Sequence, residues 1–196
     1  MRSANLFPLI AALMLAACSP AEPEVVLPLP PIPDERFTGT PQTPAPVEIS
    51  KAAAKTRDEL VREATKGSLR GLGEIAARNP EFRSNVGGQS HDRFWDLLRR
   101  TGVDPNRKLR ELFEQPAGLR EIDGQRWYVW PDLAAKDAAD LIPEKLTFQD
   151  RRRLEELIRE DGIARIRAGE GYPGMRTAIA EDGTWIYFVL GQDGEE

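Results

Sequence analysis

Trp185-Ile186-Tyr187-Phe188-Val189-Leu190 is an unbroken apolar run near the C-terminal end of the sequence. In an extended strand, successive side chains point to opposite faces of the sheet. Trp185, Tyr187 and Val189 would then share one face, and the alternate residues up to Leu190 would share the other. A strand with no polar face needs cover on both sides, so the run predicts a strand at the centre of a sheet.

Further strands are expected on the N-terminal side of this run. The Glu181-Asp182-Gly183 turn joins it to a strand at residues 175–180, and another strand is predicted at residues 163–167. A mid-chain β-hairpin is predicted at residues 119–130, where Asp123-Gly124 supplies a two-residue turn. Together these segments predict an antiparallel sheet of about five strands.

The second strand of the hairpin, residues 125–130, is rich in aromatic residues. Alternation places Trp127 and Val129 on one face of this strand, and Tyr128 and Trp130 on the other. These rings could stack on a sugar or on peptidoglycan, although packing in a core is the commoner use of such residues.

The first half of the folded region is predicted to be mainly helical, which makes the fold class α+β. Ser50, Asp104 and Thr147 stand where a helix needs an N-cap residue, and Pro105 follows Asp104 at the preferred first position. The expected helices cover residues 51–66, 69–78, 91–101, 105–115 and 148–160, with a short alanine-rich helix at 132–141.

A proline-rich segment precedes this region. About one residue in three is proline from Pro20 to Pro46, and proline fits neither a helix nor a strand ladder. Residues 18–46 are therefore predicted to be a semi-rigid tether, and residues 47–196 a single globular domain. The net charge of −5 for the 196 residues argues against a nucleic-acid partner.

The chain begins with a short positive segment and an apolar one. Arg2 precedes the apolar residues 6–15, which are too few to cross a bilayer but have the length of a signal-peptide core. Leu15-Ala16-Ala17-Cys18 follows and contains the only cysteine of the sequence.

These features resemble the signal peptide and lipobox of bacterial lipoproteins. The resemblance implies that residues 1–17 are removed and that Cys18 is lipidated with a diacylglyceryl group and an N-acyl chain. It implies a lipid-anchored protein of the bacterial cell envelope. Because Ser19 and not aspartate follows Cys18, the resemblance favours the outer membrane, with the domain facing the periplasm. The alternative is an ordinary cleaved signal peptide with a chance cysteine.

A glycine-rich pattern does not support the chemistry that it suggests, and the composition does not support a metal site. Gly169-Glu170-Gly171-Tyr172-Pro173-Gly174 matches G-x-G-x-x-G, but a dinucleotide site needs a helix directly after the glycines, and a strand is predicted there. We interpret this segment as a flexible connection between two strands. With one histidine and one cysteine in the chain, no metal site is assigned and no cofactor is expected.

The best candidate binding loop lies before the helix predicted at residue 91. It combines small polar residues and glycines with the only histidine, at a helix N-terminus where anions bind readily. Its candidate binding residues are Ser84, Asn85, Gly87, Gly88, Ser90 and His91. Adjacent Ser90 and His91 side chains seldom point at each other, and a remote acid would also be required, so no catalytic residue is assigned. A loop with a Ser or His cap is the simpler interpretation.

We therefore expect a cell-envelope lipoprotein with a non-catalytic binding or scaffold domain. Its expected partners are the membrane, through the lipid anchor, and an envelope protein or peptidoglycan. The alternatives are a small envelope hydrolase that uses the Ser90-His91 loop, and an inhibitor of a foreign hydrolase.

Overall fold

Within the described residues, four antiparallel strands form one sheet in the order β1-β2-β3-β4, and most of the helices precede them in the chain. The computed structural model describes residues 46–85 and 90–191. The strands are β1 (Gly118–Ile122), β2 (Gln125–Trp130), β3 (Met175–Ala180) and β4 (Trp185–Leu190). The helices are α1 (Lys51–Thr65), α2 (Leu69–Ala76), α3 (His91–Arg100), α4 (Pro105–Phe113) and α5 (Phe148–Arg167), with 3₁₀ turns η1 (Asp132–Ala135) and η2 (Pro143–Lys145).

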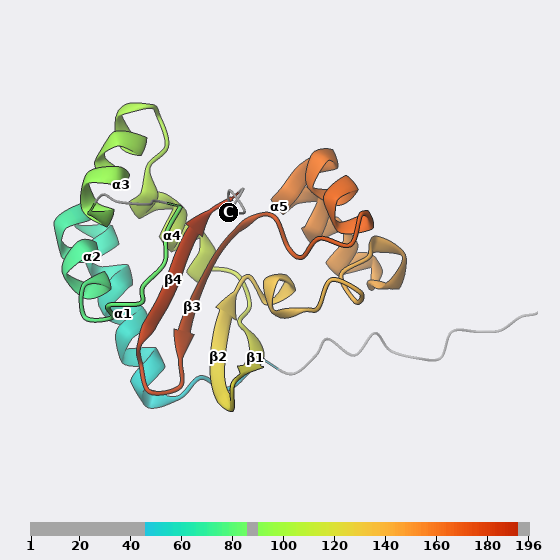
Figure 1. Cartoon of the computed structure of the whole chain (residues 1–196), viewed down its shortest axis with the longest axis horizontal. Helices are drawn as coiled ribbons and strands as arrows, with labels where there is room; N and C mark the ends of the chain where they lie inside the picture. Colours follow the sequence, from blue (N-terminus) through green and yellow to red (C-terminus); the bar gives the residue numbers. More distant parts are fainter. Residues whose placement is uncertain (1–45, 86–89, 192–196) are drawn as a thin grey trace, which may run out of the picture. The chain divides into compact units, whose positions relative to one another are not determined.

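This architecture confirms the α+β prediction. Helices α1 to α4 lie on one side of the sheet and α5 lies on the other (Figure 1). Among the residues described, no helix combines the length and the apolar character needed to cross a membrane. The predicted signal peptide, Cys18 and the tether as far as residue 45 lie outside the described residues.

The predicted helix starts are confirmed by their capping hydrogen bonds. The Ser50 hydroxyl accepts from the Ala53 N–H at 3.0 Å, and the Thr147 hydroxyl accepts from the Asp150 N–H at 3.2 Å. Asp104 accepts from the Asn106 N–H at 3.1 Å. These bonds satisfy backbone donors that have no partner within the first turn of a helix.

The predicted hairpin turn is also confirmed. Asp123 and Gly124 both have positive φ, 53° and 78°, which is the backbone of the two-residue turn that suits a twisted hairpin. The turn sets the register in which Ile122 pairs with Gln125. It places Tyr128 and Trp130 against helices α1 to α4 and Val129 on the opposite side of the sheet, as the alternation predicted.

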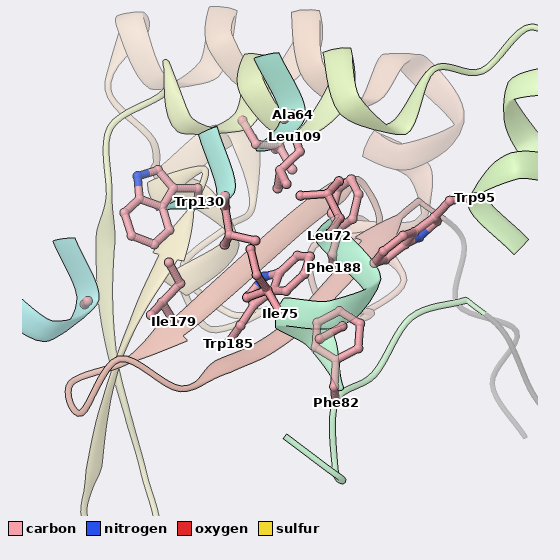
Figure 2. Packing of buried hydrophobic residues seen from close by; sticks show 14 of the residues in the cluster. Ala64, Leu72, Ile75, Phe82, Trp95, Leu109, Trp130, Ile179, Trp185 and Phe188 are labelled. Atoms are coloured by element: carbon pink, nitrogen blue, oxygen red, sulfur yellow. The ribbon is translucent and has the colours of Figure 1, made fainter. Parts of the chain in front are cut away.

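Two hydrophobic clusters cover the two faces of the sheet. The first lies between the sheet and α1 to α4, and Figure 2 shows its aromatic rings gathered around Phe188. The second lies between the sheet, α5 and η1, and includes Leu133, Leu141, Leu154 and Ile166. All four of these side chains are fully buried.

The strand predicted at residues 163–167 is wrong, because these residues form the last turns of α5. Ile163 and Ile166 both pack into the second cluster, and residues three apart share a face in a helix but not in a strand. The predicted helix end at residue 160 is close to a real break. Arg159 has φ 57° and ψ −175°, after which the helix resumes.

The short helix predicted at residues 132–141 is also wrong beyond its first turn. Only η1 forms, and Lys136 after it is extended, with φ −75° and ψ 147°. The change of direction lets Leu141 reach the cluster that contains Leu133, so burial of Leu141 overrides the helical propensity of the alanines.

The prediction that β4 is central is wrong, because β4 is the last strand of the sheet. Residues 79–85 run along its outer edge. The Arg83 N–H donates to the Ile186 carbonyl at 3.1 Å, and the Phe188 N–H donates to the Arg83 carbonyl at 3.0 Å. The Asn79 amide donates to the Trp185 carbonyl at 3.0 Å. Strand β4 is therefore buried toward α1 to α4, half-buried on its other face at Ile186 and Tyr187, and bonded along its outer edge to residues 79–85.

The predicted division of β4 into two faces is wrong as well. Ala178 pairs with Tyr187 and Ile179 pairs with Trp185, which leaves Ile186 as the extra residue of a β-bulge. The bulge reverses the alternation, so Trp185 and Phe188 lie in the same cluster, while Ile186 and Tyr187 pack on the other face.

Candidate functional site

The structure pairs His91 with Ser84 and not with the adjacent Ser90. The Ser84 hydroxyl lies 2.8 Å from His91 Nδ1, and the imidazole ring packs on the edge of Phe82 at a centroid distance of 4.8 Å. Burial lowers the pKa of the imidazole, while the Asp92 carboxylate acts in the opposite direction. Among the described residues, no carboxylate forms a hydrogen bond with this ring.

Of the other described residues of the predicted binding loop, Asn85 has a structural role. The Leu190 N–H donates to Asn85 Oδ1 at 2.6 Å, and Asn85 Nδ2 donates to the Gly191 carbonyl at 2.7 Å. Ser90 is the N-cap residue of α3, although its side chain forms no capping hydrogen bond. Gly87 and Gly88 lie outside the described residues. Asn85 thus extends the cover of the β4 edge, which is a structural role.

A surface cavity of about 360 Å³ lies on the sheet face opposite α1 to α4, and we call it the tryptophan cavity. Half-buried Trp127 and Ile186 provide its apolar surface. Its polar lining comes from Asn79, Glu81, Arg83, Gln125 and Thr184. The aromatic residue was visible in the sequence, but the polar residues come from three separate segments.

The polar side chains of the tryptophan cavity differ in how much they are used by the fold. Both polar atoms of the Asn79 side chain already form hydrogen bonds, because its Nδ2 donates to the Trp185 carbonyl and its Oδ1 accepts from the Glu81 N–H at 3.0 Å. The side chains of Glu81 and Arg83 are exposed and form no hydrogen bond or ion pair with another described residue. A charged donor and a charged acceptor therefore remain available beside the ring of Trp127.

A second surface cavity, of about 290 Å³, carries a different charge, and we call it the basic cavity. Its basic side chains are Arg120 of β1, Lys136 after η1, Arg165 of α5 and Arg176 of β3. Glu170 is the acidic residue in its lining, so the formal charge of the lining is +3. Tyr172 and Tyr187 add aromatic surface, and burial raises the pKa of the Tyr172 hydroxyl, which keeps it neutral.

The Gly169–Gly174 segment forms one wall of the basic cavity. It connects a helix to a strand, so the prediction of a link between two strands is wrong. Gly169, with φ 92°, ends α5 in a Schellman motif in which the Glu170 N–H returns to the Arg165 carbonyl at 3.1 Å. The same turn brings the Glu170 carboxylate within 2.5 Å of Arg165 Nε.

The remaining glycines of this segment have separate roles. A Cβ atom on Gly174 would lie 2.7 Å from the ring of Tyr172, so glycine lets that ring pack closely. A Cβ atom on Gly171 would meet nothing within 4 Å, because Gly171 faces open space at the basic cavity. The glycines of this segment thus shape a wall of the basic cavity. The prediction of a connection between two strands did not include this role.

The two cavities are neighbours on one face of the sheet. Arg120 of the basic cavity pairs across the strands with Trp127 of the tryptophan cavity. The ring of Trp127 also lies 6.3 Å, centroid to centroid, from Tyr187, which lines the basic cavity. An extended ligand on Trp127 would therefore reach the basic side chains.

Within the described residues, no three His, Cys, Asp or Glu side chains are grouped to hold a metal ion. Comparison with protein-family models, with curated proteins and with solved structures finds no match to the chain.

Proposed function

We propose that the chain is a lipid-anchored protein of the bacterial cell envelope and that its folded domain binds peptidoglycan without catalysis. The observation that supports binding most directly is the tryptophan cavity. The lipobox-like residues around Cys18 support the anchor, and the proline-rich tether would let the domain reach a partner away from the bilayer.

The chemistry of the tryptophan cavity suits a glycan. The C–H face of a sugar ring is apolar and packs on an aromatic ring, while its hydroxyl groups both donate and accept hydrogen bonds. Trp127 offers the ring, and Arg83, Glu81 and Thr184 offer polar groups around it. A concave site with a few polar groups at its rim is the usual form of a small-ligand site.

The anchor is tested by replacing Cys18. The Cys18→Ala chain should lose all labelling by a clickable fatty acid, because the diacylglyceryl group would be attached to that sulfur and the N-acyl chain to the amino group of the same cysteine after cleavage. Labelling of the two chains in cells, followed by gel fluorescence, makes the measurement. Equal labelling of the parent and the Cys18→Ala chain would end the lipoprotein proposal.

Glycan binding is tested by replacing Trp127. Purified full-length chain in detergent should sediment with insoluble peptidoglycan, and Trp127→Ala should weaken this binding at least about tenfold, which corresponds to roughly 1.4 kcal/mol. The matched control is Leu119→Ala, since Leu119 is 47% exposed on the same hairpin but alternates to the other face. Parent-like sedimentation of Trp127→Ala would contradict the proposal.

A small envelope hydrolase is the second candidate function, favoured by the 2.8 Å contact between Ser84 and His91. The sedimentation experiment separates the two functions. Soluble fragments released from peptidoglycan by the parent chain, but not by Ser84→Ala, would support the hydrolase. Under the binding proposal, both chains leave the peptidoglycan intact.

A further inference from the structure

The basic cavity concentrates positive charge on a protein whose formal charge is −5. Four basic side chains from four separate elements converge there against one carboxylate. Like charges held close together repel, so such a cluster is most stable when a negative group lies among them. The convergence of distant segments also means that no local charge pairing along one helix explains it.

Three of the four basic side chains already have partners, since Arg176 donates to the Tyr172 and Gly174 carbonyls at 3.1 Å and 3.2 Å. Arg165 pairs with Glu170, and Arg120 lies 3.5 Å from Asp137, a carboxylate that is 76% exposed. Lys136 is half-buried, and its ammonium group forms no hydrogen bond or ion pair with the other residues in the described ranges. This ammonium group, in a lining of positive formal charge, is well placed to bind an anion.

The ligand of this cavity is constrained by its neighbour. Trp127 and Tyr187 contact each other between the two cavities, and Arg120 lies across the strand pair from Trp127. A chain of sugar rings stacked on Trp127 would therefore place its next substituents over Arg120 and Lys136. Neutral sugars carry no negative charge to balance the four basic side chains, whereas an acidic glycan does.

We propose that the basic cavity binds an acidic group, a carboxylate or a phosphate, of the glycan that stacks on Trp127. This inference rests on the proposed function and narrows its ligand to an acidic glycan. Arg120 and Lys136 contact the acidic group, and the wall at Gly171 leaves room for it.

The experiment compares a neutral and an acidic trisaccharide. Isothermal titration of the full-length chain in detergent should show that trigalacturonate binds at least about tenfold more tightly than the neutral N-acetylglucosamine trimer. Added salt should reduce this preference, because screening weakens interactions between exposed charges. Equal affinities for the two trisaccharides would overturn the proposal.

Two variants test whether the acidic group of the glycan binds in the basic cavity. Gly171→Asp adds a carboxylate at the cavity wall where no atom obstructs it, and Lys136→Gln removes the available ammonium group. Both should weaken trigalacturonate binding, Gly171→Asp at least about tenfold, and leave binding of the neutral trimer unchanged. Lys51→Gln is the control, since Lys51 is exposed on α1, across the sheet. Unchanged trigalacturonate binding in both variants would refute the assignment.

Competition by acetate and by inorganic phosphate, measured at constant ionic strength so that screening is equal, identifies the acid that the cavity prefers. Competition by either anion against trigalacturonate supports the proposal, and the stronger competitor names the group; competition by neither overturns it. Failure of the glycan function itself has a different signature. Trigalacturonate binding that requires Lys136 but not Trp127 would overturn the shared site alone, whereas parent-like sedimentation of Trp127→Ala with peptidoglycan would overturn the glycan function.

Discussion

Truncation of Phe188 to alanine should lower the free energy of unfolding by about 3–5 kcal/mol, the usual cost of removing a buried phenylalanine ring. Phe188 is fully buried although β4 is an edge strand. Its ring stacks on Trp185 at 6.2 Å and lies 5.9 Å from Trp95, so the substitution would open a cavity at the centre of the first cluster (Figure 2). The midpoint and slope of urea unfolding measure the loss.

The matched control for buried Phe188 is a phenylalanine that lies on the surface. Phe148 at the start of α5 is 80% exposed, so Phe148→Ala should change the stability by less than about 0.5 kcal/mol. Because small domains have a total stability of about 5–15 kcal/mol, Phe188→Ala would remove much of it. A parent-like urea midpoint for Phe188→Ala would show that the first cluster does not stabilise the fold as described.

Truncation of Trp95 to alanine should cost a similar 3–5 kcal/mol and should also loosen α3. Trp95 is the buried residue of that helix, and its ring meets Phe82, His91, Trp185 and Phe188. Without this ring, α3 would keep only partly buried contacts to the rest of the domain. Amide hydrogen exchange should therefore accelerate in α3 more than in β2 or β3, in addition to a lower urea midpoint.

Two further variants test whether Trp95 stabilises the domain by packing. One is a surface control on the same helix, and the other removes the indole N–H of Trp95 but keeps an aromatic ring. Leu97 is 54% exposed on the same helix, so Leu97→Ala should leave both the stability and the exchange of α3 nearly unchanged. The indole N–H of Trp95 is buried and forms no hydrogen bond with a described residue. Trp95→Phe removes this unsatisfied donor and should cost much less than Trp95→Ala. Equal losses for the two Trp95 variants would refute the packing argument.

Local features of this fold could be predicted because their hydrogen bonds close within a few residues. The caps at Ser50 and Thr147 and the turn at Asp123-Gly124 depend on side chains and backbone angles at those positions alone. The strand predicted at residues 163–167 was wrong because five residues with only two isoleucines are too short for their pattern to separate a strand from a helix. Its assignment was decided by distant residues such as Leu133 and Leu154, which share its cluster.

The position and register of β4 could not be predicted for a related reason. An apolar run without alternation has no polar residue to fix which face points where, so the bulge at Ile186 leaves no trace in the sequence. The run correctly indicated cover on both faces, but its place in the sheet depended on residues 79–85. The same limit applies to the basic cavity, since Arg120, Lys136 and Arg176 converge only in the folded chain.

An unpaired sheet edge can template the addition of a strand from another chain, which is how domain swapping and fibril growth begin. Along β4 this addition is blocked, because Asn79, Arg83 and Asn85 already occupy its outward-facing backbone groups. The opposite edge, β1, is five residues long and carries exposed Arg120 and Glu121, charges that disfavour strand addition. Copies of this domain crowded side by side would therefore meet without joining their sheets.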